Sequence, residues 1–154
     1  MIALAVLEHV ADPQRVVDEI WRALKPQGCV FASTPFLQPV HMGAYDFTRY
    51  TYLGHRRLFR RFTDLASGMA LGPGSVLAWS LQSALLSLSA RRTYRLIAKF
   101  VGLLISVPIK YLDYIARHNP AAIDGAGGVF FFGRKQEASI SDRELIKLYR
   151  GGFH

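Results

Sequence analysis

Two groups of polar side chains in the first third of the chain could carry out acid–base chemistry. Glu8 and His9 directly follow an apolar run over residues 1–7. The second group follows a later apolar run and consists of His41, Asp46, Arg49 and Tyr50. An unperturbed imidazole titrates near neutral pH, so His9 is a candidate general base or a group that orients a reactant.

The second group could shape a binding pocket, in which Arg49 pairs with an anionic group or with Asp46. Each candidate also has a structural interpretation. Glu8 and His9 could cap the following helix or hydrogen-bond a loop. The Asp46–Arg49 pair could merely order its own loop, and Tyr50 could be a packing residue. The sequence leaves these alternatives open.

The two groups follow the two strands of a predicted β–α–β unit. Residues 1–7 form a continuous apolar run typical of a buried parallel strand, and residues 29–33 form another. Between them, Asp12 and Pro13 provide the N-cap and first turn of a helix, which ends at residues 25–28. Such strands are parallel, and open α/β sheets bind ligands at the carboxyl ends of their strands. The sequence therefore predicts that both polar groups lie at one edge of the sheet.

The rest of the chain is predicted to be mainly helical before a last strand. A loop rich in aromatic residues, proline and glycine covers residues 36–51. Helices are expected over residues 51–62, 74–88, 94–117 and 143–149. Pro108 should kink or break the third of these helices, and Ser141 should cap the last one. A glycine-rich turn precedes a strand over residues 129–133.

Composition indicates one folded domain with a basic surface. Of the 154 residues, 51% are hydrophobic and 19% are charged, so the chain can bury a core and is not disordered. The net charge of +8 favours anionic partners. No nucleic-acid-binding module accompanies the basic residues, so nucleic acid is not an expected partner. The single cysteine, Cys29, lies in an apolar run, which favours a buried side chain and a reducing, cytoplasmic compartment.

Two apolar runs are too short to cross a bilayer. After a turn at residues 72–74, one uncharged run covers residues 75–90 and a second covers residues 100–109. A spanning helix needs roughly 20 apolar residues. These runs are expected to be buried helices or a helical hairpin that lies against a membrane surface.

The order of these motifs resembles the second half of a type-11 class I S-adenosylmethionine (SAM)-dependent methyltransferase. The matching motifs are Leu7-Glu8-His9, Asp12-Pro13, Leu24-Lys25-Pro26-Gln27-Gly28 and Thr34-Pro35. Residues 46–51, Asp-Phe-Thr-Arg-Tyr-Thr, resemble the segment after the family's fifth strand, and residues 124–133 resemble its final strand region. Gln27 stands where the family usually has glycine. The resemblance covers residues 1–62 well and 120–149 loosely, and it leaves a helical insertion over about 75–118 unexplained.

The resemblance implies an α/β fold: a partial Rossmann-like class I methyltransferase sheet, strands four to seven, with a helical insertion. Residues 1–154 would be the C-terminal part of a methyltransferase domain. The glycine-rich loop that approaches SAM belongs to the first half of that fold and is not seen in this sequence. The glycines at residues 125–128 precede a strand and form a turn.

The resemblance also assigns roles to the polar residues. Leu7 and Glu8 would border the methionine part of SAM, the implied cofactor, and His9 would be the catalytic residue beside the methyl acceptor. The substrate-binding residues would be His41, Asp46, Arg49 and Tyr50. No metal site is expected, because the five histidines are scattered along the chain and Cys29 is the only cysteine.

Two hypotheses about function follow. The first is a SAM-dependent methyltransferase of a small-molecule or lipid-like acceptor, present here in an N-terminally truncated form that is inactive in isolation. The second is a non-catalytic methyltransferase-like binding module, either peripheral to a membrane through residues 75–118 or completed by a partner chain. Both place the protein in the cytoplasm, with membrane association as a variant of that location.

Overall fold

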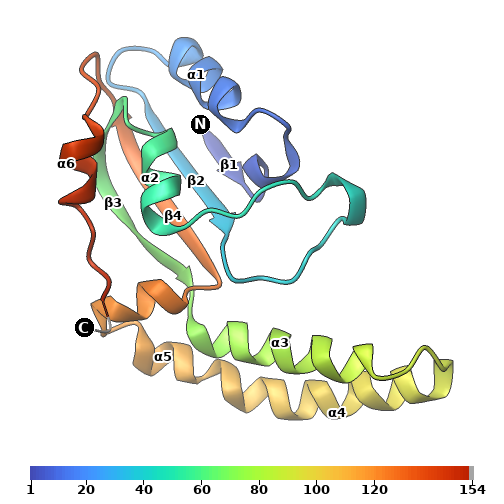
Figure 1. Cartoon of the computed structure of the whole chain (residues 1–154). Coiled ribbons are helices and arrows are strands. Elements are labelled where there is room, and N and C mark those ends of the chain that lie inside the picture. Colours follow the sequence, from blue (N-terminus) through green and yellow to red (C-terminus); the bar gives the residue numbers. More distant parts are fainter. Residues whose placement is uncertain (153–154) are drawn as a thin grey trace.

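The computed structural model describes residues 1–152 and shows an α/β fold, as predicted, in which helices flank a four-stranded sheet (Figure 1). The strands are β1 (Ile2–Leu4), β2 (Cys29–Pro35), β3 (Phe62–Leu71) and β4 (Gly128–Lys135). The helices are α1 (Pro13–Ala23), α2 (Tyr52–Leu58), α3 (Pro73–Ser87), α4 (Arg92–Lys110), α5 (Leu112–Ala116) and α6 (Asp142–Ile146). Short 3₁₀ turns cover Leu7–His9, Gly43–Tyr45 and Pro120–Gly125.

The sheet has the strand order β1-β2-β4-β3. β1 and β2 are parallel, with Ala3 opposite Ala32, which confirms the predicted β–α–β unit. β4 lies between β2 and β3 and is antiparallel to both. Within residues 1–152, no strand pairs with the outer edge of β1, so β1 is an edge strand.

The prediction of a buried strand over residues 1–7 is wrong in two respects. β1 ends at Leu4, and Ala5 adopts the left-handed conformation (φ 49°) before the chain enters the 3₁₀ turn. Of the strand residues only Ala3 is buried, whereas the side chains of Ile2 and Leu4 are 72% and 56% exposed. An edge strand with one neighbour leaves such side chains uncovered.

The sequence pattern does not predict β3. Ala66, Ser67 and Gly68 lie in its centre, and small residues of this kind give a weak strand signal. The strand also pairs with β4 through two register shifts, the first between Asp64 and Ala66, which interrupt the alternation of side chains.

Capping hydrogen bonds begin two helices where the sequence predicts them. The carboxylate of Asp12 accepts a hydrogen bond from the main-chain nitrogen of Arg15 at 3.0 Å, and Ser141 forms a capping box with Glu144. α2 and α6 both end earlier than predicted. Gln27 has a φ of 64°, in the left-handed region that glycine adopts most easily. This conformation explains why glycine suits the turn between α1 and β2.

One face of the sheet carries the main core. α1 and α2 contribute to this face, where Phe59, Phe62 and Phe131 are fully buried and their rings pack together. The other face is apolar but only partly covered. Its partly or fully exposed side chains are Ile2, Leu4, Phe31, Phe130 and Phe132. Cys29, predicted to be buried, is only half-buried.

α3 and α4 pack side by side in a helical hairpin that projects from the sheet (Figure 1). Small residues form the contact: Ala98, Gly102 and Ser106 of α4 are buried, and the Ser106 hydroxyl donates to the carbonyl of Ala78 at 3.2 Å. Small residues allow two helices to approach closely, so larger side chains of α4 point outward. Across the described residues, no helix is long and apolar enough to cross a membrane.

The predicted helices over residues 74–88 and 94–117 correspond to α3 and to α4 with α5. Pro108 does not end α4 directly; the interruption comes after it, at Tyr111. Asp113 of α5 reaches the first turn of α3, which has no side-chain cap of its own. Its carboxylate accepts hydrogen bonds from the main-chain nitrogen of Gly74 at 2.7 Å and from the hydroxyl of Ser75 at 2.6 Å. Asp113 therefore caps α3 from another helix.

Candidate functional site

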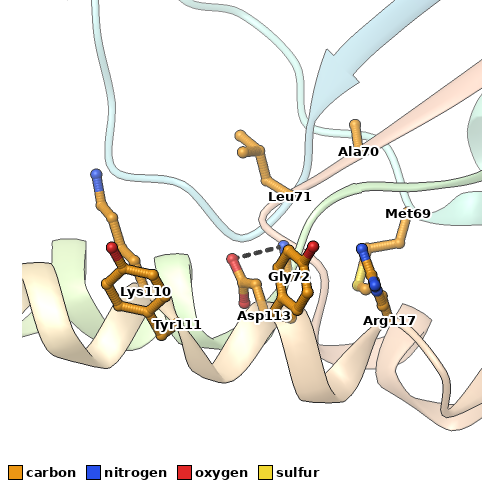
Figure 2. Close-up of a pocket in the computed structure, with 9 residues that line it drawn as sticks. Met69, Ala70, Leu71, Gly72, Lys110, Tyr111, Asp113 and Arg117 are labelled. Atoms are coloured by element: carbon orange, nitrogen blue, oxygen red, sulfur yellow. Dashed lines mark hydrogen bonds between the residues drawn. The ribbon is translucent and has the colours of Figure 1, made fainter.

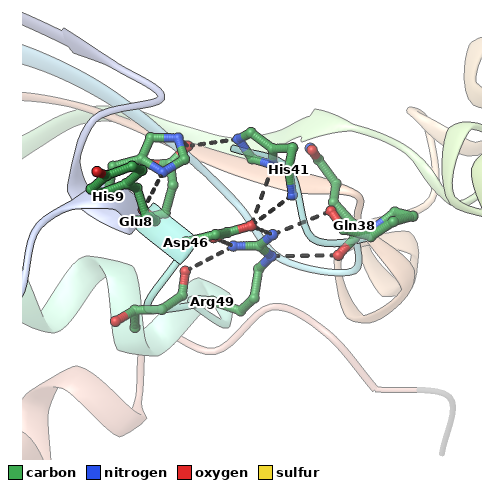
Figure 3. A network of polar contacts seen from close by, with 9 residues as sticks. Glu8, His9, Gln38, His41, Asp46 and Arg49 are labelled. Atoms are coloured by element: carbon green, nitrogen blue, oxygen red, sulfur yellow. Dashed lines mark hydrogen bonds and ion pairs between the residues drawn. The ribbon is translucent and has the colours of Figure 1, made fainter. Parts of the chain in front are cut away.

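The two predicted polar groups meet at the carboxyl ends of β1 and β2 (Figure 3). The 3₁₀ turn Leu7–His9 follows β1, and the loop over residues 36–51 follows β2. The loop is fastened to the turn by its main chain, because the nitrogens of Phe47 and Thr48 donate to the carbonyl of Glu8 at 2.8 and 3.3 Å. The prediction that both groups lie at one edge of the sheet is confirmed.

Glu8 lies at the centre of this cluster. Its side chain is fully buried, and neither carboxylate oxygen has a hydrogen-bond partner. The nearest basic side chains are two imidazoles: Oε1 lies 3.8 Å from Nε2 of His9 and 3.7 Å from Nε2 of His41. The two imidazole rings pack edge to face with centroids 4.9 Å apart. The fold thus joins histidines that are far apart in the sequence.

The outer nitrogen of each imidazole faces an oxygen acceptor. Nδ1 of His9 lies 2.8 Å from the carbonyl of Tyr45, which can only accept, so Nδ1 carries the proton. Nδ1 of His41 lies 3.6 Å from the carboxylate of Asp46. In His9 this arrangement leaves Nε2, the nitrogen that faces Glu8, with a free lone pair in the neutral state. The Nδ1–Asp46 separation of His41 is longer than a hydrogen bond and does not fix the tautomer of that ring.

Asp46 and Arg49 form a bidentate ion pair inside the loop. The Arg49 guanidinium holds the pKa of the buried Asp46 carboxyl well below its usual range, and the pairing raises the pKa of Arg49. Arg49 also donates to the main-chain carbonyls of Gln38, Pro39 and Thr48. All of these contacts lie within the loop, so the pair orders the loop, as in the structural interpretation of these two residues.

Two of the predicted site residues are core or packing residues in this structure. Leu7 is fully buried in the main core, so only its main chain could contact a ligand. Tyr50 is partly buried, with its ring 6.2 Å from that of His55, and burial raises the pKa of its hydroxyl. This position agrees with the packing interpretation of Tyr50.

The cluster opens into a cavity of about 240 Å³. The residues that line it are Ala5, Glu8, Ser33, Thr34, Pro35, Gln38, His41, Leu71 and Gly128. A shallower cleft adjoins it between the loop and α3, where Trp79 and Leu86 form an apolar wall. Gln38 and His41 line both hollows, whereas His9 lines neither.

Sequence reasoning missed three of these residues: Thr34, Gln38 and Trp79. The hydroxyl of Thr34 is buried without a hydrogen-bond partner. Its position at the carboxyl end of β2 is a signal that could have been used, because ligands bind at such strand ends. Trp79 could not be placed from sequence, since α3 belongs to the unexplained insertion.

A larger cavity of about 520 Å³ lies where β3 meets the hairpin (Figure 2). Met69, Leu71 and Tyr111 give it a mainly apolar wall, with Lys110 and Arg117 at its sides. Its single carboxylate, Asp113, is already engaged at the start of α3. The acid–base groups gather at the smaller cavity, which is therefore the better candidate for a reactive site.

The fold and this cluster define an α/β protein with a polar cleft at the carboxyl edge of its parallel strands. Residues 1–32 match the family model of a methyltransferase domain, and this match confirms the resemblance over that segment. No curated protein matches the chain.

Two solved structures are similar to the chain at 16% sequence identity. One is described as the crystal structure of the [4+2]-cyclase SpnF, with a TM-score of 0.39 over 89% of this chain and 49% of that one. The other is the StiE O-MT, with a TM-score of 0.42 over 96% of this chain and 47% of that one. The chain thus spans about half the length of these structures.

Proposed function

We propose that this chain is the acceptor-side part of a SAM-dependent methyltransferase. The observation that carries the proposal is the Glu8–His9–His41 cluster. It lies at the carboxyl ends of two parallel strands and beside a cavity, in a chain whose first 32 residues match a methyltransferase domain. Open α/β sheets bind their ligands at this edge.

We expect that the described residues do not hold SAM by themselves. Residues 1–152 contain no glycine-rich loop between a strand and a helix, and Leu7 is buried in the core. The cavity of about 240 Å³ is also smaller than most ligand pockets, which measure about 300–1,000 Å³. SAM would supply the methyl group. The contribution of this chain is to the acceptor.

His41 is the better placed of the two histidines to act on an acceptor. It lines the cavity and the adjoining cleft, and its side chain is 39% exposed. In the tautomer that carries its proton on Nδ1, beside Asp46, the Nε2 lone pair can remove a proton from an acceptor hydroxyl or amine. The carboxylate of Glu8, 3.7 Å from Nε2, would stabilise the imidazolium that forms. We therefore assign the base to His41 and a positioning role to His9.

Further elements would complete the site across the open side of the sheet. β1 has a free edge, and the partly covered face exposes Ile2 and Leu4 beside Phe31. Strands that pair with β1, and helices that cover this face, would bury these side chains. We propose that these elements belong to the same polypeptide and that a partner chain is the alternative source.

The test starts with the intact mass of the native protein from its source cells. A product roughly 8–12 kDa heavier than 17.3 kDa, about the size of a three-strand half-domain, supports the proposal. That protein should transfer a labelled methyl group from SAM, and His41→Ala should slow the transfer by about 10²–10⁴-fold. A native mass of 17.3 kDa together with no SAM binding would favour a non-catalytic binding module instead.

The surface of the hairpin favours a second role, peripheral binding to an anionic membrane. From residue 65 to residue 112 the chain has no acidic residue. The exposed basic residues near the tip are Arg91, Arg92, Arg95 and Lys99. The most exposed apolar side chains of α4 are Leu96, Ile97, Phe100, Leu103 and Leu104. Apolar and basic side chains on one helix are typical of helices that lie in the membrane interface.

Vesicle co-sedimentation tests this role. The chain should bind vesicles that contain phosphatidylserine and bind vesicles of phosphatidylcholine much less. Replacing Phe100 and Leu104 with serine should abolish binding, whereas the matched change of Leu65 to serine, in β3, should not. Equal recovery of all variants with both kinds of vesicle would exclude the role.

A further inference from the structure

We propose that Glu8, His9 and His41 bind a divalent metal ion of the zinc type. The three side chains each offer one donor atom, and these atoms lie within 4.8 Å of one another. The expectation of no metal site rested on the wide spacing of the histidines in the sequence. The loop over residues 36–51 binds the 3₁₀ turn Leu7–His9, and this contact brings His9 and His41 together in the folded chain.

The buried carboxylate of Glu8 points to a cation. Both of its oxygens are inaccessible and lack a hydrogen-bond partner. An ionised carboxylate in such a position is costly unless a positive charge or a metal compensates it. Arg49 acts on Glu8 only through longer-range attraction, because Asp46 and three main-chain carbonyls engage the donors of its guanidinium. A bound cation beside Oε1 would satisfy this group.

The orientation of the two imidazoles points to a metal ion in particular. Metal-bound histidines usually direct the outer ring nitrogen to a carboxylate or a main-chain carbonyl, which fixes the ring and its tautomer. His9 directs Nδ1 to the carbonyl of Tyr45, and His41 directs Nδ1 towards the carboxylate of Asp46. Both Nε2 atoms face Oε1 of Glu8. All three donors therefore converge on one space.

The distances suit a zinc ion after a small adjustment. Donors bound to tetrahedral zinc at about 2.0–2.2 Å lie roughly 3.3–3.6 Å apart. Oε1 of Glu8 is 3.8 Å from Nε2 of His9 and 3.7 Å from Nε2 of His41. The donor atoms of the three residues all lie within 4.8 Å of one another, so small rotations of the side chains that bring the donors closer together would close the site. Two imidazoles and one carboxylate are a ligand set that zinc accepts with a fourth position open.

The fourth position would face the cavity. Glu8 and His41 line it together with Gln38 and Thr34, whose hydroxyl has no hydrogen-bond partner. A polar atom of an acceptor could enter there and bind the ion. This location in an acceptor cleft rests on the proposed function, whereas metal binding itself does not. With the ion bound, both Nε2 atoms would be ligands and the ion would supply a Lewis acid for the acceptor, so that His41 would act as the base only in the metal-free protein.

The proposal can be tested by calorimetric titration with zinc alone. The full chain is first freed of metal with a chelator. We expect one ion per chain. His9→Ala, His41→Ala and the isosteric Glu8→Gln should each weaken binding by at least about tenfold, the lower bound seen for the supporting residues of metal sites. His118→Ala is the matched control, because His118 is exposed on the surface, and it should bind zinc like the wild type. Equal zinc affinity in all four variants, or no zinc binding by the wild type, would overturn the proposal.

A second measurement needs no variant. Zinc should protect His9 and His41 of the wild-type chain from modification by diethyl pyrocarbonate, read by mass spectrometry of peptides, and should leave His118 reactive. Unchanged modification of His9 and His41 would overturn the proposal even if an alanine variant fails to fold. A native protein that transfers methyl groups but binds no zinc would overturn the metal site alone. Zinc binding without methyl transfer would count against the proposed function alone.

Discussion

Replacing Asp46 with asparagine should destabilise the protein by about 2–3 kcal/mol at pH 7. The change keeps the shape of the side chain and removes its charge. Breaking a buried ion pair on one side costs about 3–5 kcal/mol when the remaining charge is fully buried. Arg49 is 23% exposed and keeps its main-chain acceptors, so we place the loss at or below the lower end of that range.

The effect should depend on pH with a definite sign. The pKa of Asp46 in the folded protein lies below its ordinary value of 3.8, which applies to the unfolded chain. The ionised carboxylate therefore contributes its full stabilisation above about pH 3.8 and loses it as the pH falls towards the folded-state pKa. The difference between wild type and Asp46→Asn should be constant from pH 5 to 7 and should narrow below about pH 4.

Urea unfolding followed by circular dichroism, at a series of pH values, measures both quantities. Asp142→Asn is the control, because Asp142 pairs with Arg57 on the exposed surface, and its loss should be small. Equal losses of stability in the two variants at pH 7 would refute a stabilising buried ion pair at Asp46. A loss in Asp46→Asn that is the same at pH 3 as at pH 7 would refute the expected pH dependence.

Three further changes test other parts of the structure. Asp113→Ala removes the acceptor at the start of α3 and should cost about 1–3 kcal/mol, with faster amide exchange in the first turn of α3 than in α1. Burial lowers the pKa of His55 to about 3 from its ordinary value of 6.5, so the unfolded chain takes up a proton at a higher pH than the folded chain and stability falls as the pH drops below about 6.5. His55→Leu should therefore reduce the dependence of the free energy of unfolding, measured with urea, on pH between 6.5 and 4. An unchanged pH dependence in the variant would contradict this. The free edge of β1 predicts self-association of the wild-type chain in sedimentation velocity, and Ile2→Lys should reduce it without loss of thermal stability, because Ile2 is exposed on this edge strand.

Local sequence signals predicted much of the fold. Asp12 and Ser141 mark helix starts because the cap, its partner and the helix are neighbours in the chain. β3 was not predictable, because the small residues in its centre have no strand preference and its pairing with β4 is irregular. The exposure of β1 was not predictable either, since an apolar run does not tell how many neighbours a strand has.

In the candidate site, too, the sequence predicted the local features and not those that depend on contacts between distant residues. Sequence order placed Glu8, His9 and His41 after parallel strands, and hence at one edge of the sheet. It could not show that two imidazoles converge on one carboxylate, because that depends on the hydrogen bonds from Phe47 and Thr48 to the carbonyl of Glu8. It also could not separate the anion-binding and loop-ordering roles of Arg49, because that choice depends on contacts made only in the folded loop.

The hydrogen bonds of the Asp113 carboxylate hold the end of the hairpin that lies beside the sheet, whereas the tip is far from this contact. α3 carries Trp79 and Leu86, one wall of the cleft, and its first turn is held by a residue of α5. A displacement of the distant tip, such as contact with a surface would produce, would then rotate α3 about its first turn. Trp79 and Leu86 would move relative to Gln38 and His41, so the width of the cleft would change with the position of the tip.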